Sequence, residues 1–263
     1  MVCAVVAFNV HAVVLAAEFA LLSRVNPGPG VPRPGAVALF AAWRGEIWTG
    51  LRVFCWRQPF RSNALPNRLE RSASGKRGVV LVHGFVCNRG LWNPWMRRLR
   101  GMDAPFVAVN LEPLFGSIDG YVQPIDEAVA QLEALTGRPP IIVAHSMGGL
   151  AVRAWLRDRQ AEGRVHSVVT IGAPHGGTWL ARFAVTTNMR QMRRSSQWLR
   201  SLAASESAHR RAIFTCFFGH CDNIVFPAAT AMLPGAENRH VPGVAHVHLA
   251  FQPVVYDEVL RRL

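Results

Sequence analysis

Apolar runs and amphipathic stretches alternate along most of this chain of 263 residues, from about residue 78 onward. Five short runs rich in valine, isoleucine and phenylalanine predict buried strands over residues 79–83, 106–109, 141–145, 167–171 and 212–218. The helical spacing of apolar positions between them predicts helices over residues 92–100, 124–136 and 149–160. Strands that alternate with helices in this way predict an α/β fold, with a mostly parallel central sheet flanked by helices.

The first 25 residues form a hydrophobic segment with a different pattern. Residues 1–22 are apolar except for Asn9, His11 and Glu18, and a helix of that length extends about 33 Å, enough to cross the apolar part of a bilayer. No basic residue precedes the run and no clear cleavage site follows it, which favours an uncleaved membrane anchor over a signal peptide. The alternative is a helix that packs on the protein itself. We therefore expect membrane association through this helical extension, on a side that the charge pattern leaves open.

Residues 26–77 are predicted to form a linker followed by an amphipathic helix. The stretch NPGPGVPRPG, residues 26–35, is too rich in proline and glycine to be a regular element. Residues 36–56 then have helical periodicity, with Trp43, Trp48 and Trp56 near arginines. This combination suits either a membrane interface or the surface of an ordinary amphipathic helix.

Composition narrows the classes of partner and cofactor. Half of the residues are hydrophobic, which excludes a disordered chain. The 29 basic residues outnumber the 16 acidic ones and give a net charge of +13, which favours contact with an anionic surface. Nucleic acid is not an expected partner, because the arginines are scattered and no nucleic-acid motif is present. Five cysteines without a C-x-x-C pair argue against zinc and thioredoxin-like sites; whether Cys216 and Cys221 pair is left open.

The stretch PPIIVAHSMGGLAVRAWLRD, residues 139–158, carries the strongest chemical signal. A predicted strand ends directly before Ser146, and a predicted helix begins near Gly149. A serine on such a sharp turn projects out of the sheet, and the residues two before and two after it must be small, as Ala144 and Gly148 are. The helix behind the serine also directs its N–H groups and its dipole toward the site. The pattern therefore predicts a nucleophilic serine.

Residues 78–263 resemble the α/β-hydrolases, and among them the bacterial triacylglycerol lipases and esterases. The resemblance is carried by HGF at 83–85, AHSMGG at 144–149, IGAPHGGT at 171–178, CDNIVFP at 221–227 and VPGVAHVHL at 241–249. Alanine stands where the usual serine turn of the family begins with glycine. The resemblance implies an α/β-hydrolase fold for the catalytic domain and a cap at about residues 176–211. That cap is either a lid that meets lipid or an ordinary helical region packed on the core.

The resemblance also implies the catalytic residues. Ser146 corresponds to the nucleophile, Asp222 to the acid and His246 to the base, in the order Ser, Asp, His along the chain. His248 is an alternative base, since a shift of two residues would keep it on the same side of the chain. Glu237 is an alternative acid.

The oxyanion hole and the substrate-binding residues follow from the same resemblance. The backbone N–H groups of Phe85 and Met147 are expected to stabilise the oxyanion. The residues expected around the substrate are His83, Gly84, His145 and His175. Gly84 lets its loop turn tightly, and the His83 ring is expected to hydrogen-bond across that loop rather than act as the base. His145 is expected to point to the other face of its strand, and His175 to form part of the wall.

These residues together predict a serine hydrolase that cleaves carboxylic esters, with lipid acyl esters as the expected substrates. Catalysis through an acyl-enzyme needs no metal or organic cofactor, and no calcium ligands like those of some larger relatives are identified. Two other functions stay open. An acyltransferase or thioesterase would use the same three residues, and a membrane-anchored binding protein would keep the fold without turnover.

Overall fold

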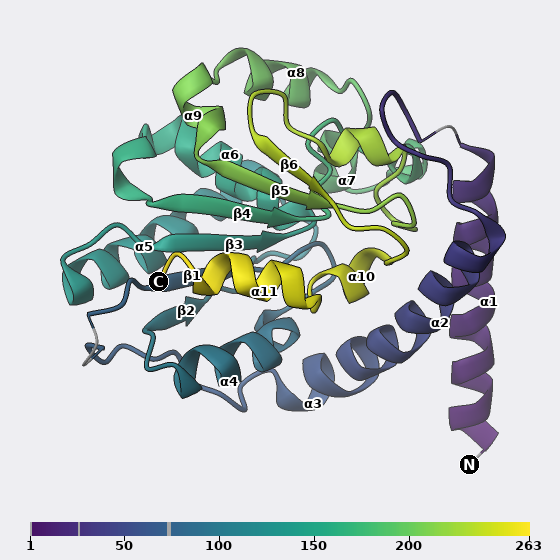
Figure 1. Ribbon diagram of the computed structural model, residues 1–263, viewed down its shortest axis with the longest axis horizontal. Coiled ribbons are helices and arrows are strands. Elements are labelled where there is room, and N and C mark those ends of the chain that lie inside the picture. Colours follow the sequence, from purple (N-terminus) through teal and green to yellow (C-terminus); the bar gives the residue numbers. More distant parts are fainter. Residues whose placement is uncertain (1, 26, 73–74) are drawn as a thin grey trace.

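The central sheet contains six strands and organises the molecule (Figure 1). The computed structural model describes residues 2–25, 27–72 and 75–263, and of residues 2–10 the backbone alone. Met1, residue 26 and residues 73–74, which belong to the predicted N-terminal helix and linker, lie outside the described residues. The strands are β1 (Val79–Val82), β2 (Phe106–Ala108), β3 (Ile141–His145), β4 (Ser167–Ile171), β5 (Phe214–Phe218) and β6 (Glu237–His240).

The sheet has the order β2-β1-β3-β4-β5-β6, and each of its strand pairs is parallel. The first five strands coincide with the predicted apolar runs to within a few residues. The sequence pattern does not predict β6, because its residues are polar and the strand lies at the edge of the sheet. The α/β-hydrolase topology expected from the resemblance is therefore present.

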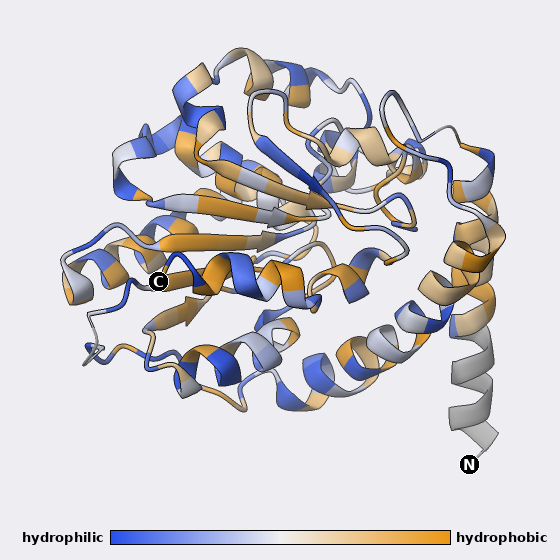
Figure 2. Ribbon diagram, in the orientation of Figure 1, coloured by the Kyte–Doolittle hydropathy of each residue, from blue (hydrophilic) through white to orange (hydrophobic). Residues whose placement is uncertain are grey.

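Alternating residues of the inner strands pack into two separate cores, because successive side chains of a strand point to opposite faces. Val80, Ile142 and Val168 pack with α5 (Val122–Thr136), α6 (Met147–Arg159) and α8 (Gln197–Ala204). Their neighbours in sequence pack on the other face, with α4 (Asn93–Gly101) and α11 (Pro253–Leu260). Figure 2 shows the resulting pattern, with mainly hydrophobic inner strands between helices of mixed hydropathy, whereas the edge strand β6 is hydrophilic.

The region predicted as a cap consists of short helices. They are η5 (Trp179–Phe183), α7 (Thr187–Gln191), α8 and α9 (Ala208–Ala212). The remaining short helices are η2 (Arg89–Trp92), η3 (Ile118–Tyr121), η4 (Glu162–Arg164), η6 (Ala228–Ala231) and α10 (His246–Leu249). α11 is separate from α10, because Pro253 begins α11 and has no N–H to continue the hydrogen bonding of a preceding turn.

The N-terminal helices lie beyond the carboxyl ends of the strands (Figure 1). They are α1 (Val2–Arg24), α2 (Ala36–Arg52), the π-helical turn η1 (Val53–Arg57) and α3 (Gln58–Arg61). Phe19 and Leu22 of α1 are buried in one cluster with residues of the segments that follow β5. Packing on the protein itself, the alternative considered for the hydrophobic segment, is thus observed for this part of α1. Within the described residues, no helix combines the length and the apolarity that a membrane crossing requires.

Candidate active site

Ser146 occupies a strained turn between β3 and α6. Its backbone has φ 56° and ψ −130°, a positive φ that is unfavourable for a residue with a side chain. Gly148 is required two residues later, since a Cβ atom there would lie 2.5 Å from the carbonyl oxygen of His83. The crowding atoms are the backbone oxygens of Val82 and His83, at the end of β1. The turn presents Ser146 at the carboxyl end of the sheet, as predicted.

Asp222 and His246 meet beside this turn. Asp222 lies in the loop after β5, and its Oδ1 atom accepts the backbone N–H groups of Ile224 and Val225 at 2.9 and 2.7 Å. Its Oδ2 atom lies 2.9 Å from Nδ1 of His246. Burial alone would lower the pKa of His246, but the charge and the hydrogen bond of Asp222 raise it above its ordinary value. The carboxylate therefore orients the imidazole and stabilises its protonated form.

Ser146 and His246 line the same cavity of about 330 Å³. Asp222 lies behind His246 and is almost fully buried. In the part of the chain that the structure describes, the Ser146 hydroxyl and the His246 ring are not hydrogen-bonded to each other. Such contacts often tighten only when substrate binds. The arrangement can still support acyl transfer, because a serine and a carboxylate-oriented imidazole share one cavity.

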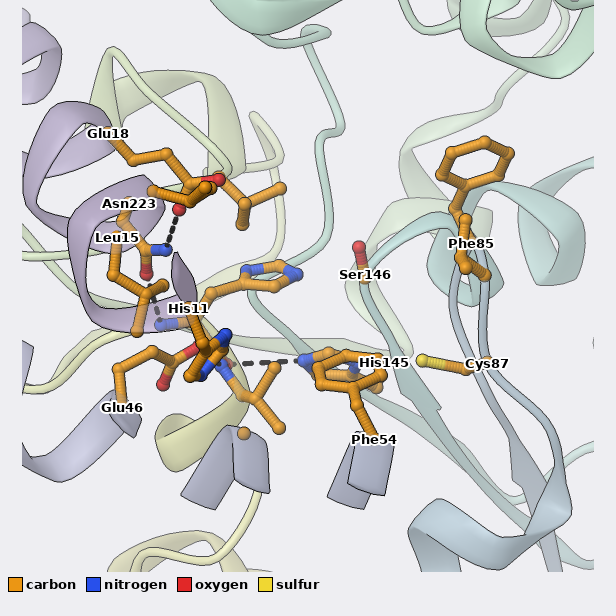
Figure 3. Close-up of a pocket in the computed structure, with 16 residues that line it drawn as sticks. His11, Leu15, Glu18, Glu46, Phe54, Phe85, Cys87, His145, Ser146 and Asn223 are labelled. Atoms are coloured by element: carbon orange, nitrogen blue, oxygen red, sulfur yellow. Dashed lines mark hydrogen bonds between the residues drawn. The ribbon is translucent and has the colours of Figure 1, made fainter. Parts of the chain in front are cut away.

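Gly84 brings the predicted oxyanion loop against the serine. A Cβ atom on Gly84 would lie 2.7 Å from Cβ of Ser146, so the close approach itself requires glycine. The next residue, Phe85, lines the cavity (Figure 3). Met147 is the first residue of α6, and its N–H group consequently has no acceptor within the helix. Both backbone positions expected to form the oxyanion hole thus adjoin Ser146.

The histidines expected near the substrate make different contacts in the structure. The His83 ring braces its loop: Nε2 accepts the Leu111 N–H at 3.0 Å, and Nδ1 lies 2.9 Å from the Gly84 carbonyl oxygen. Burial lowers the pKa of His83 to about 4, which keeps the ring neutral. His145 lines the cavity, with Nε2 3.2 Å from the His246 carbonyl oxygen (Figure 3). Burial also lowers the pKa of His145.

His175 does not line the cavity that holds Ser146. Its ring contacts Thr170 and Cys216, and its carbonyl oxygen accepts a hydrogen bond from Arg153. It borders a separate cavity in which Arg153 forms a buried ion pair with Glu206. The structure therefore places His175 between β4 and β5 and the second cavity, rather than in the wall of the cavity that holds Ser146.

The alternative acid and base also lie elsewhere. Glu237, on β6, interacts with Arg239 and Thr215, and Nδ1 of His248 packs against Gly45 of α2. Cys216 and Cys221 are both free thiols. Among the residues described, no group of three or more His, Cys, Asp or Glu side chains is arranged to hold a metal ion.

Among the cavity residues not anticipated from the sequence are four with histidine, carboxyl or amide side chains: His11, Glu18, Glu46 and Asn223. Three of them lie in the N-terminal segment, which was interpreted as an anchor and linker. One signal was available, because Glu18 and Glu46 are the only acidic residues in the first 69 and both interrupt apolar stretches. An isolated carboxylate in such surroundings indicates a buried partner.

Comparison with known proteins agrees with the fold. A family model described as "Alpha/beta hydrolase family" matches residues 79–258. The structure is similar to lipase B of Aspergillus fumigatus, with a TM-score of 0.62 and 21% identity over 71% of this chain and 52% of that one. It is also similar to the mature form of the Bacillus licheniformis lipase BlEst2, with a TM-score of 0.63 and 17% identity over 71% and 91% of the two chains.

This chain thus spans about half the length of the Aspergillus lipase. At these levels of identity the similarity concerns the fold. A search of curated protein sequences finds no match.

Proposed function

Because this chain belongs to the alpha/beta hydrolase family, we propose that it is a serine hydrolase that cleaves carboxylic esters of lipids through a Ser-His-Asp triad. One observation carries the proposal. The strained turn presents Ser146 to the cavity that His246 lines, with Asp222 2.9 Å from Nδ1 of that histidine. The lipase structures that share the fold support ester hydrolysis as the reaction class.

The reaction follows from the roles of these three groups. Nε2 of His246 takes the hydroxyl proton as Oγ of Ser146 attacks the ester carbonyl carbon, and the N–H groups of Phe85 and Met147 stabilise the oxyanion. His246 then donates the proton to the departing alcohol, leaving an acyl group on Ser146. Water, activated by His246, attacks this acyl-enzyme and releases the carboxylic acid. Asp222 keeps Nδ1 protonated and the ring oriented throughout.

The apolar lining of the cavity is evidence that the acyl group of the substrate binds there. Its apolar lining comes from both the N-terminal helices and the catalytic domain, and includes Val14, Leu15, Phe54, Phe85, Ile224 and Val247. Apolar surface of this kind favours a hydrocarbon chain, because its burial removes apolar area from water.

Hydrolysis of p-nitrophenyl esters by the full chain tests the proposal. We expect turnover with acyl groups from acetate to palmitate, with a preference for chains longer than acetate because of the apolar cavity. The full chain is needed, since residues of α1 and α2 form one wall of the cavity. Absence of both turnover and labelling by a fluorophosphonate in folded protein would contradict the proposal. Faster turnover of the matching acyl thioesters would instead favour a thioesterase.

We further propose that the outer face of α2, η1 and α3 rests on an anionic lipid surface. Large apolar side chains on this face are more than half exposed: Val37, Phe40, Trp48, Trp56 and Phe60. Exposed arginines lie among them in the sequence: Arg44, Arg52 and Arg61. Aromatic and basic side chains together favour an interface with anionic headgroups. Phe54, in the adjacent π-helical turn, lines the cavity, so a lipid on this surface would lie near its entrance.

Vesicle flotation measures this contact. The full chain is expected to bind phosphatidylcholine vesicles more strongly when they contain phosphatidylglycerol. Replacement of Trp48 and Trp56 by serine should weaken binding by roughly tenfold or more, because each ring contributes buried apolar area. Leu69→Ser is the matched control. Leu69 is exposed and follows Arg68, which pairs with Phe106 at the start of β2, so it lies at the opposite end of the sheet from α2. Equal binding of all three proteins would refute the contact.

A further inference from the structure

Two carboxylates reach the active site from helices outside the region matched by the family model. Glu46 of α2 is buried, with 3% of its surface exposed, and Glu18 of α1 is half-buried. Both line the cavity that contains Ser146 (Figure 3). The rest of the N-terminal segment up to residue 69 carries no other acidic residue. The two carboxyl groups of this segment are thus directed inward, at the loops that carry Asp222 and His246.

Glu46 binds the start of the helix that carries His246. Its Oε1 atom accepts the N–H of Val247 at 2.8 Å, and Oε2 accepts the N–H of His248 at 2.9 Å. These N–H groups belong to the first turn of α10, where no acceptor within the helix exists. The preceding residue, Ala245, has no side chain able to cap them. Glu46 therefore caps α10 from a position about 200 residues earlier in the chain.

Glu18 binds the loop of the catalytic acid. Its Oε2 atom accepts a hydrogen bond from Nδ2 of Asn223 at 2.6 Å (Figure 3). Asn223 follows Asp222 directly, and its Oδ1 atom accepts the backbone N–H of His246 at 3.3 Å. Glu18 thus orients an amide that links the loop of the acid to the residue that acts as base.

The buried position of Glu46 is energetically costly for a carboxylate, unless its two hydrogen bonds to α10 compensate for the lost hydration. Its neighbours on the inner side of α2, Ala42, Ile47 and Gly50, are apolar or lack a side chain, so a carboxylate among them loses its hydration. Burial raises the pKa of Glu46 to about 7, against the opposing effect of its two N–H donors. Packing alone would favour an apolar side chain here. The capping bonds are what the carboxylate adds.

We infer that Glu46 is a positioning residue for the base His246, and that Glu18 positions Asn223 between the acid and the base. On this view α1 and α2 complete the catalytic centre, although they lie outside the matched family region. The inference rests on the proposed function for its catalytic consequence, but the positioning itself can be measured without turnover.

The test compares Glu46→Gln with Ile47→Val in the full chain. Ile47 is the buried neighbour of Glu46 on α2 and does not line the cavity. Glutamine keeps the size of the side chain but offers one acceptor oxygen for two N–H groups. We expect kcat to fall about 10- to 100-fold with little change in KM, because small displacements of a catalytic base have effects of this size. Ile47→Val should retain the kcat of the wild-type chain.

A second readout does not depend on activity. The titratable groups that face His246 are Asp222, Glu46 on α2, Glu18 on α1 and His145 at the end of β3. Since the negative charge of Glu46 raises the pKa of His246, Glu46→Gln should lower that pKa in an NMR titration of the histidine rings. Ile47→Val should leave it unchanged.

The outcomes separate the two hypotheses. If the wild-type chain neither hydrolyses esters nor reacts with a fluorophosphonate, the proposed function fails, while the titration still shows whether Glu46 acts on His246. If Glu46→Gln and Ile47→Val agree in both kcat and the pKa of His246, the positioning role is refuted.

Glu18→Ala provides a second variant at a less buried site, with an expected loss in kcat of about three- to tenfold. A Glu18→Ala chain with the wild-type kcat would refute the part assigned to Glu18.

Discussion

Replacement of Ser146 by alanine is expected to lower kcat for ester hydrolysis by at least about 10³-fold, since removal of a nucleophilic serine elsewhere has cost up to about 10⁶-fold. The reason is that no acyl-enzyme can form without Oγ, and the cavity would then act only through binding and the oxyanion donors. The change should be measured as kcat with a saturating p-nitrophenyl ester, beside circular dichroism to verify folding.

Ser195→Ala is the control for this substitution. Ser195 also has a positive φ, of 57°, but it lies in the cap and borders the other cavity. Its replacement should leave kcat unchanged. If Ser146→Ala kept a rate within about tenfold of the wild-type chain, Ser146 could not be the nucleophile.

Asp222→Asn is expected to lower kcat by about 10³- to 10⁴-fold while preserving the fold. An asparagine oxygen can still accept the N–H groups that Oδ1 of Asp222 now binds, from Ile224 and Val225. Its NH₂ group then faces Nδ1 of His246, which must present a lone pair. The proton of the neutral ring moves to Nε2, the atom that has to accept the proton of Ser146. The imidazole is held in the wrong tautomer.

The same substitution should also shift the pH profile of kcat/KM in a defined direction. Asp222 raises the pKa of His246, although burial opposes it. Loss of the carboxylate should therefore move the acidic limb of kcat/KM to lower pH, because the imidazole gives up its proton more readily. Glu237→Gln, at the alternative acid, is the control and should leave both kcat and the limb in place. The reverse pattern between the two variants would identify Glu237 as the acid.

The N-terminal segment shows how one pattern can have two explanations. An apolar run long enough to cross a bilayer was interpreted as an anchor, with packing on the protein as the alternative. The described part of α1 packs on the catalytic domain through Phe19 and Leu22. It also contributes Leu15 and Glu18 to the cavity wall. A hydropathy profile cannot distinguish a protein core from a lipid core, because both exclude water from the same side chains.

Features that depend on neighbours in the chain could be predicted from the amino-acid sequence alone. The strands over β1, β3 and β4 were predictable because their apolar runs are short, bounded and rich in β-branched residues. The turn at Ser146 was predictable because a strand, a serine and two glycines follow one another within a few residues. Both signals arise from local backbone geometry, which the amino acids at those positions largely dictate.

Which distant groups meet becomes visible only in the folded chain. Asp222 lies beside His246, the base that the resemblance implied, and not beside His248, whereas His175 lies outside the cavity that it was expected to border. The pairing of Glu46 with α10 joins residues about 200 positions apart. No local pattern encodes such a contact, since it results from the packing of α2 across the carboxyl ends of the strands. A lone glutamate in an apolar helix indicates that a buried partner exists, and only the folded chain identifies that partner.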